Sequence, residues 1–143
     1  MTRGRWIYTG GRAGHKPSER EKHEIDRACE AFINDVLKPG FLPESRPTSF
    51  NYPTDIFGKW HGGKYRFVQR FRSDHPENAV DPEFDSPFAR IEYVSRDRFD
   101  VSYFRHTGQW WTVYRGVSLA EALSLLETEG IFHPISLGVG PSP

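Results

Sequence analysis

DIFGKWHGGKYRFVQRFR, residues 55–72, alternates apolar and polar side chains on both sides of the glycine pair at 62–63. Alternation with a period of two is typical of a β-strand, and a glycine pair between two such runs is typical of a tight hairpin turn. A two-residue loop then places Lys59 directly opposite Arg66. One face of the hairpin is apolar, and we expect it to pack in the core. This apolar face carries Ile56, Trp60, Tyr65, Phe67 and Phe71.

The second face of the hairpin is basic. Like charges directly across a strand pair destabilise it, so an anionic partner would relieve the repulsion, and the commonest such partner is a phosphate backbone. The alternative is that the acidic stretch 73–86, which we expect to be a loop, folds back and neutralises this face. An ion pair of Asp81, Glu83 or Asp85 with these bases would support that alternative and contradict nucleic-acid binding by this face. The basic face consists of Lys59, His61, Lys64, Arg66, Arg70 and Arg72.

Three more alternating runs, at 88–95, 99–106 and 109–116, bring the predicted sheet to about five strands. A three-residue loop in the first of these hairpins places Tyr93 opposite Val101. With this pairing, apolar and polar side chains of the hairpin fall on opposite faces of the sheet. The apolar face of this hairpin carries Ala89, Ile91, Tyr93, Phe99, Val101 and Tyr103.

The last hairpin has aromatic rings on both of its faces. Strands of this kind lie in a sheet that is covered, wholly or partly, on both sides, and we expect the first and last helices to be the covers. Its turn places Arg105 opposite Trp110, where the two side chains can form a cation–π pair. The alternative is a ligand groove lined by aromatic side chains. Its lining would be Tyr103, Phe104, Trp110, Trp111 and Tyr114.

Amphipathic helices flank the predicted sheet on both sides in the sequence. Ser18 with Glu21, and Ser118 with Glu121, have the spacing of capping boxes, and apolar residues follow each pair every three or four positions. The Pro-Gly pair at 39–40 predicts the end of the first helix. The order predicts an α+β fold: an N-terminal helix, an antiparallel meander of about five strands and a C-terminal helix.

The domain organisation follows from these bounds. We expect a basic N-terminal arm at 1–17, a single α+β domain at 18–133 and a C-terminal tail at 134–143. The chain of 143 residues has a single cysteine, Cys29, which lies on the apolar stripe of the first helix. We therefore expect a buried thiol and no disulfide, in a cytoplasmic protein without a membrane span.

Motifs for catalysis, cofactors and metals are missing from the sequence. The 6 histidines lack the spacing of metal ligands, and neither a nucleophile elbow nor a phosphate-binding glycine-rich loop occurs. We expect no metal, no cofactor and no catalytic residues. A metal-dependent nuclease stays open as one alternative, since Glu92 and Asp100 lie on neighbouring strands, although Arg115 is expected to pair with Asp100.

The strand and helix order, with the motifs ARIEYV, YFRHTGQWWTVY and GIFHP, resembles a bacterial family with a domain of unknown function, number three thousand and twenty-four. The resemblance covers residues 20–133. It departs from the family pattern at Phe104, where members carry Trp, and at Arg105, which stands one place before the family's arginine. It implies no activity. The matching aromatic positions are Tyr103, Phe104, Trp111, Tyr114 and Phe132.

Two classes of binding function fit this sequence. The first is a nucleic-acid-binding module that uses the basic face and the arm, in which Trp6 and Tyr8 are available to stack on bases. The second is a protein-interaction module, an adaptor or immunity-type partner, that uses the aromatic hairpin and the acidic stretch. Salt separates them, since phosphate contacts weaken steeply with ionic strength. The nucleic-acid set is Lys59, Lys64, Arg66, Arg70, Arg72, Arg3, Arg5, Trp6 and Tyr8.

Overall fold

The computed structural model describes residues 16–42, 51–73 and 83–134. Both arms expected from the sequence lie outside the described residues, apart from residues 16, 17 and 134. The described chain is α+β, as the sequence predicts. Its elements are α1 (Glu19–Phe32), η3 (Ile33–Leu37), α2 (Lys38–Phe41), β1 (Asn51–His61), β2 (Lys64–Ser73), β3 (Glu83–Ser95), β4 (Arg98–Phe104), β5 (Trp110–Val117), α3 (Leu119–Thr128) and η5 (Gly130–Phe132).

The first helix begins with the predicted capping box. Ser18 Oγ accepts a hydrogen bond from Glu21 N at 3.1 Å, and Glu21 Oε1 accepts one from Ser18 N at 3.0 Å. The other carboxylate oxygen of Glu21 accepts from the Tyr93 hydroxyl at 2.9 Å, which ties the helix start to β3. The helix continues beyond the predicted stop through the π-helical η3 into the single turn α2. Pro39 lies in the first turn of α2, at the junction where the π-helical turn ends.

Replacing Ser18 with alanine is expected to lower the free energy of unfolding by about 1 kcal/mol. The variant loses the side-chain acceptor for Glu21 N. Urea denaturation of Ser18→Ala, compared with Ser18→Asp, tests this, since aspartate restores an acceptor at the N-cap. An equal loss in both variants would contradict a capping role.

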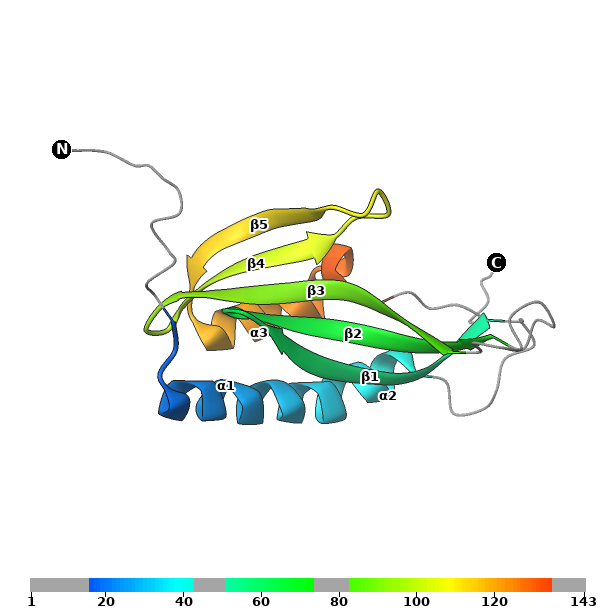
Figure 1. Ribbon diagram of the computed structural model, residues 1–143, viewed down its shortest axis with the longest axis horizontal. Coiled ribbons are helices and arrows are strands. Elements are labelled where there is room, and N and C mark those ends of the chain that lie inside the picture. The colour runs from blue at the N-terminus through cyan, green and yellow to red at the C-terminus, as the bar shows by residue number, and fades with distance from the viewer. Residues whose placement is uncertain (1–15, 43–50, 74–82, 135–143) are drawn as a thin grey trace.

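The sheet is an antiparallel meander with strand order β1-β2-β3-β4-β5 (Figure 1). The first hairpin has the predicted register, with Lys59 opposite Arg66. The third strand begins at Glu83, five residues before the predicted start, so the end of the acidic stretch is strand rather than loop. That strand lies beside β2, where Phe84 is opposite Phe71 and their rings stack at 5.2 Å.

The second hairpin departs from the predicted register by two residues, since Tyr93 lies opposite Phe99 rather than Val101. Its turn is tighter than predicted because Asp97 adopts a left-handed backbone conformation, with φ of 53°, and the register shifts between Tyr93 and Ser95. A slip of two residues keeps every side chain on its predicted face. The apolar face is therefore confirmed, although the pairing is not.

The third hairpin departs from the prediction by one residue near its turn. Phe104, not Arg105, lies opposite Trp110. Arg105 instead closes the loop, because its N–H donates to the Gln109 carbonyl and its carbonyl accepts from Gly108 N, both at 2.8 Å. The register shifts again along β5, where Val101 lies opposite Tyr114. Counting from the predicted turn, with Arg105 opposite Trp110, gives this same pair.

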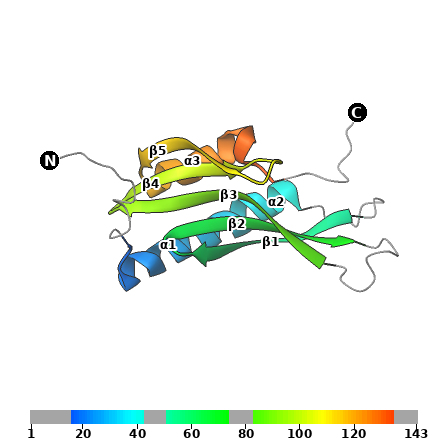
Figure 2. The same ribbon diagram turned by 45° about the horizontal axis from the view of Figure 1, so that its top comes forward.

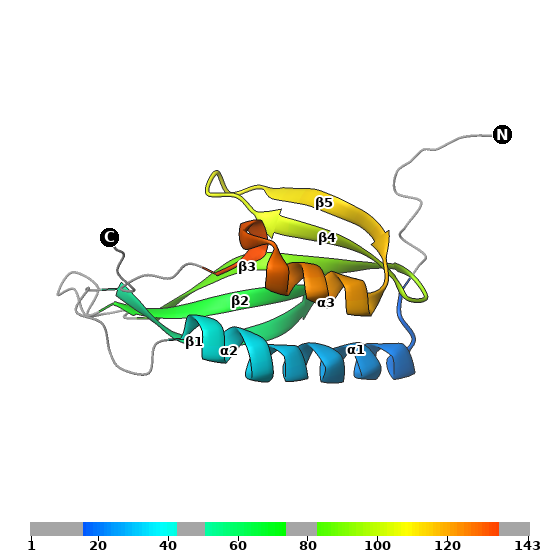
Figure 3. The same ribbon diagram turned by 180° about the vertical axis from the view of Figure 1, so that it is seen from behind.

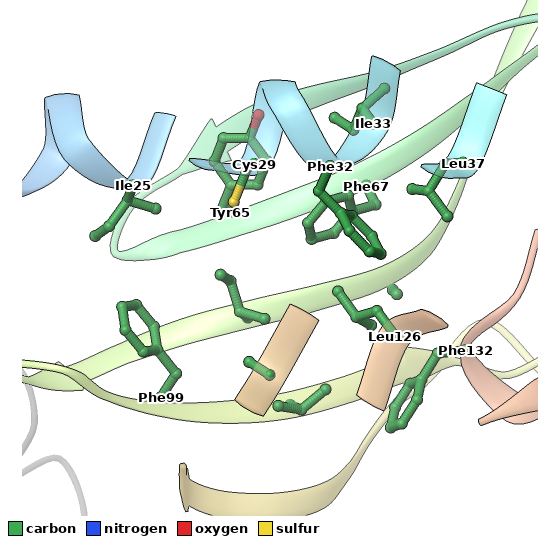
Figure 4. Close-up of a cluster of buried hydrophobic side chains, with 14 of the residues drawn as sticks. Ile25, Cys29, Phe32, Ile33, Leu37, Tyr65, Phe67, Phe99, Leu126 and Phe132 are labelled. Carbon is green, nitrogen blue, oxygen red and sulfur yellow. The ribbon is translucent and has the colours of Figure 1, made fainter. Parts of the chain in front are cut away.

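Both long helices pack on the same side of the sheet, which corrects the expectation that they cover both of its faces (Figures 1 and 3). Their apolar stripes meet the apolar face of β2, β3 and β4 in one core (Figure 4). Phe67, fully buried, lies at its centre with its ring 6.3 Å from that of Phe32. Within the described residues, no helix covers the other side of the sheet (Figure 2), which we call the open face.

Candidate functional site

Three cations stand in direct cross-strand register on the open face. Lys59 of β1 lies opposite Arg66 of β2, and Arg66 lies opposite Arg90 of β3. We call Lys59, Arg66 and Arg90 the cationic row. Lys59 is exposed and the two arginines are half-buried. Within the described part of the chain, the row has no ion pair with a carboxylate, so three like charges stand next to one another on adjacent strands.

A tryptophan of the edge strand covers part of this row. The guanidinium carbons of Arg90 and Arg66 lie 4.5 Å and 5.5 Å from the centre of the Trp110 ring. Trp110 also packs against Phe104, with ring centres 4.9 Å apart. The Nε atoms of both arginines are buried without a hydrogen-bond partner in the described structure. Burial lowers the pKa of Arg90, and the neighbouring positive charge of Arg66 adds to this against the opposite effect of Glu92.

A shallow cavity of about 160 Å³ adjoins the row between β1 and β3. Its lining combines three apolar side chains with polar ones that include a carboxylate. They are Phe57, Val68, Pro87, Lys59, His61, Arg66 and Asp85. The open face therefore offers positive charge beside apolar surface. A phosphate group with a sugar or base attached has the complementary combination, negative charge beside apolar surface.

The far end of the predicted basic face is neutralised within the sheet. Arg70 Nε and Nη2 donate to the two carboxylate oxygens of Asp85 at 2.8 Å and 3.1 Å, and Arg70 also lies over the Phe57 ring. The hydrogen bonds from Arg70 hold the pKa of Asp85 below its ordinary value. Arg72 lies opposite Glu83. The alternative that acidic residues neutralise this face is thus confirmed for Arg70, and this ion pair is the outcome expected to contradict nucleic-acid binding by the whole basic face. The candidate site is therefore limited to the cationic row.

Of the other residues that the sequence assigned to nucleic-acid binding, only Lys64 lies near the cationic row in the described structure. Lys64, half-buried at the hairpin tip, lies opposite both His61 and Glu92. The arm residues of the nucleic-acid set lie outside the described residues. They are Arg3, Arg5, Trp6 and Tyr8.

The predicted aromatic groove is not formed, because its five rings are divided between surfaces. Tyr103 and Tyr114 pack against Phe132 on the helix side of the sheet, at 6.4 Å and 6.2 Å. Phe104 and Trp110 lie together on the open face. Trp111 is 48% exposed and carries the Arg105 guanidinium at 4.8 Å from its ring centre, whereas Arg105 was expected beside Trp110.

The two carboxylates that kept the nuclease alternative open, Glu92 and Asp100, both lie beside cationic side chains. Asp100 is buried, accepts from Gly116 N at 3.1 Å and forms the expected ion pair with Arg115 at 3.3 Å. Glu92 lies directly opposite Asp100 on the neighbouring strand. Among the described residues, no group of three His, Cys, Asp or Glu side chains is placed to hold a metal ion.

Arg90 is the residue of the candidate site that sequence reasoning missed. Its place depends on the pairing of β2 with β3, where a shift in register between Phe67 and Val68 sets Arg90 opposite Arg66. A pattern read within one hairpin cannot give this contact. The available signal was an arginine inside the apolar run at 88–95, at a position that alternation assigns to the open face.

The fold and site define this protein as a two-layer α+β domain, with helices on one side of a five-stranded meander and a cationic row on the other. A family model described as a domain of unknown function, DUF3024, matches residues 17–134, and the chain belongs to that family. The resemblance drawn from the sequence is thereby confirmed. No curated protein and no solved structure matches the chain. In the described residues, no helix has the length and apolar character to span a membrane.

Proposed function

We propose that this domain binds nucleic acid through the phosphate backbone, on the open face of its sheet. The observation that carries the proposal is the cationic row, three like charges in direct register without a carboxylate partner among the described residues. Like charges placed directly across strands destabilise a sheet. A bound polyanion offsets that cost and releases its own counterions.

The arrangement of the face supports a single strand rather than a duplex. An antiparallel sheet with helices on one side and an open side carrying aromatic residues is a common platform for single-stranded nucleic acid. The apolar side chains of Phe57, Val68 and Pro87 in the cavity beside Lys59 and Arg66 are a surface on which a sugar or base can rest. Sequence preference is expected to be weak, because backbone contacts carry no sequence information.

Charge reversal at Lys59 and Lys64 tests the proposal. The double variant Lys59→Glu/Lys64→Glu is expected to bind a fluorescent single-stranded oligonucleotide at least ten times more weakly at low salt, and its salt dependence is expected to flatten by about 0.7 in log–log slope per lost contact. Fluorescence anisotropy at several salt concentrations measures both quantities.

The matched control reverses the same number of charges away from the open face. Arg20 and Arg27 are exposed residues of α1, and Arg20→Glu/Arg27→Glu changes the net charge equally. We expect this control to retain most of the binding. An equal loss in both variants would show a net-charge effect without a site, and absence of binding to any oligonucleotide at low salt would refute the proposal.

The N-terminal arm is proposed as an accessory element of the same function. It carries Arg3 and Arg5 for phosphate contacts and Trp6 and Tyr8 for stacking on bases. Removing residues 1–15 is expected to weaken oligonucleotide binding without altering the fold.

A protein-interaction module is the second candidate, and the edge strand favours it. β5 pairs with β4 on one side only and exposes Trp111 and Val113, at 48% and 42%. An exposed edge with apolar side chains is suited to adding a strand from another chain. Binding of this kind changes little with salt, which distinguishes it from phosphate-driven binding.

A further inference from the structure

Arg66 and Arg90 form a more specific feature than the row as a whole. They lie opposite each other in register, and their guanidinium groups approach the same Trp110 ring. Directly opposed side chains in neighbouring strands have Cβ atoms about 5 Å apart, so the two charges are close. Contact with the ring is favourable to each cation but does not neutralise either.

The hydrogen-bonding capacity of these two side chains is only partly used. Each guanidinium has five N–H donors, and the single donor on Nε is buried and unpaired in both residues. The donors left for a ligand are those on the Nη atoms. Both side chains are half-buried, so these donors are held in place by packing rather than free to move over the surface.

Acidic residues limit the direction in which a bound phosphate chain can run here. Along β3, Glu92 lies two residues beyond Arg90, and Asp85, paired with Arg70, lies in the opposite direction. A phosphodiester chain that followed β3 would run from positive charge into carboxylates at both ends. A chain that crosses the strands along the cationic row, or one that ends with a single phosphate group at the arginine pair, avoids them.

We propose that Arg66 and Arg90 clamp one dianionic phosphate group, of the kind that terminates a nucleic-acid strand or a nucleotide. Two guanidiniums match the two charges of a terminal phosphate, whereas a diester within a strand carries one charge. Arginine is suited to this role because its planar fork donates two parallel hydrogen bonds to one phosphate. This inference rests on the proposed function in one respect, since it places the strand's end on the same open face.

The experiment compares one single-stranded oligonucleotide with a 5′-phosphate and with a 5′-hydroxyl. We expect the phosphorylated strand to bind about ten times more tightly, which is the effect of one or two charge-assisted hydrogen bonds. Arg66→Gln and Arg90→Gln should each remove this preference. Lys64→Gln should weaken both strands and keep the ratio between them, because Lys64 lies outside the clamp. Arg90→Lys, which keeps the charge and loses the fork, should also reduce the preference.

Thermal unfolding with inorganic phosphate separates this inference from the proposed function. We expect millimolar phosphate to raise the Tm of the wild-type protein and to have a much smaller effect on Arg66→Gln and Arg90→Gln. Without phosphate, both variants should be as stable as wild type or more stable, because the repulsion between two half-buried cations is gone. This comparison also shows whether the variants fold.

The outcomes are distinguishable. Equal binding of both strands overturns the clamp and leaves nucleic-acid binding intact. Failure of every oligonucleotide to bind, together with stabilisation by phosphate that depends on both arginines, supports the clamp and overturns the proposed function. Stabilisation by phosphate that persists in both glutamine variants overturns the clamp.

Discussion

Replacing Phe67 with alanine is expected to lower the free energy of unfolding by about 3–5 kcal/mol. Phe67 is fully buried, and its ring contacts those of Phe32, Tyr65 and Phe88. Its cross-strand neighbours are Gly58 on β1 and Ala89 on β3, the two smallest residues of the apolar face. Neither side chain can fill the space that the ring leaves, so a cavity persists in the core. The loss of unfolding free energy is therefore expected near the upper end of the range for Phe→Ala substitutions.

Equilibrium denaturation in guanidinium chloride measures this loss, and Phe84→Ala provides the matched control. Phe84 is 44% exposed and stacks on Phe71, so its removal opens no enclosed cavity and should cost much less. A loss below about 1 kcal/mol for Phe67→Ala would mean that the core collapses around the missing ring.

The fold was largely predictable because its main signals are local. The glycine pair at 62–63 fixes the first hairpin, and every cross-strand pair predicted from it occurs in the structure. The predicted register was wrong in the second and third hairpins, because the number of residues in each turn differed from the number assumed. A left-handed Asp97 shortened the second turn, and Arg105 with Gln109 lengthened the third. Alternation preserved the faces in the second hairpin, since a slip of two residues leaves side chains on the same side of the sheet.

The candidate site was less predictable because it depends on contacts between hairpins. Lys59 and Arg66 follow from one hairpin, whereas Arg90 and Trp110 reach them from β3 and β5. Asp85 is a residue that a contact between strands removes from the candidate site's surroundings as a free charge. It was assigned to a loop, but it lies in β3 opposite Arg70 and neutralises a residue that the sequence had assigned to the site. Alternation specifies a residue's face and not its neighbours on other strands.

The side on which α3 packs was also outside the reach of local patterns. Rings on both faces of the last hairpin suggested two covered faces. The rings on the helix side, Tyr103 and Tyr114, pack against Phe132, and the rings on the open face pack against each other and against arginines. Aromatic surface on the open face is therefore covered by cations instead of a helix.

Substituting alanine for Gly58 is expected to destabilise the protein by about 3 kcal/mol, the upper part of the usual range for overpacking. A methyl group on Gly58 would overlap the Oη, Cζ and Cε1 atoms of Tyr65. Such an overlap is relieved cheaply when a side chain can move, but Tyr65 is 3% exposed and is held by edge-to-face contacts with Trp60 and Phe67. The close approach of the Tyr65 ring to the β1 backbone therefore requires glycine at this position.

A double-mutant cycle with Tyr65 shows whether this overlap is the cause. Tyr65→Ala alone should destabilise the protein by removing a buried ring, and Gly58→Ala should then add little, because the atoms it would meet are gone. Gly63→Ala is the control for introducing a methyl group near the same hairpin, since nothing lies within 4 Å of its added Cβ and the change should stay within about 0.5 kcal/mol. Additive losses from Gly58→Ala and Tyr65→Ala would contradict the overlap and would place the origin of the Gly58 requirement in the β1 backbone itself.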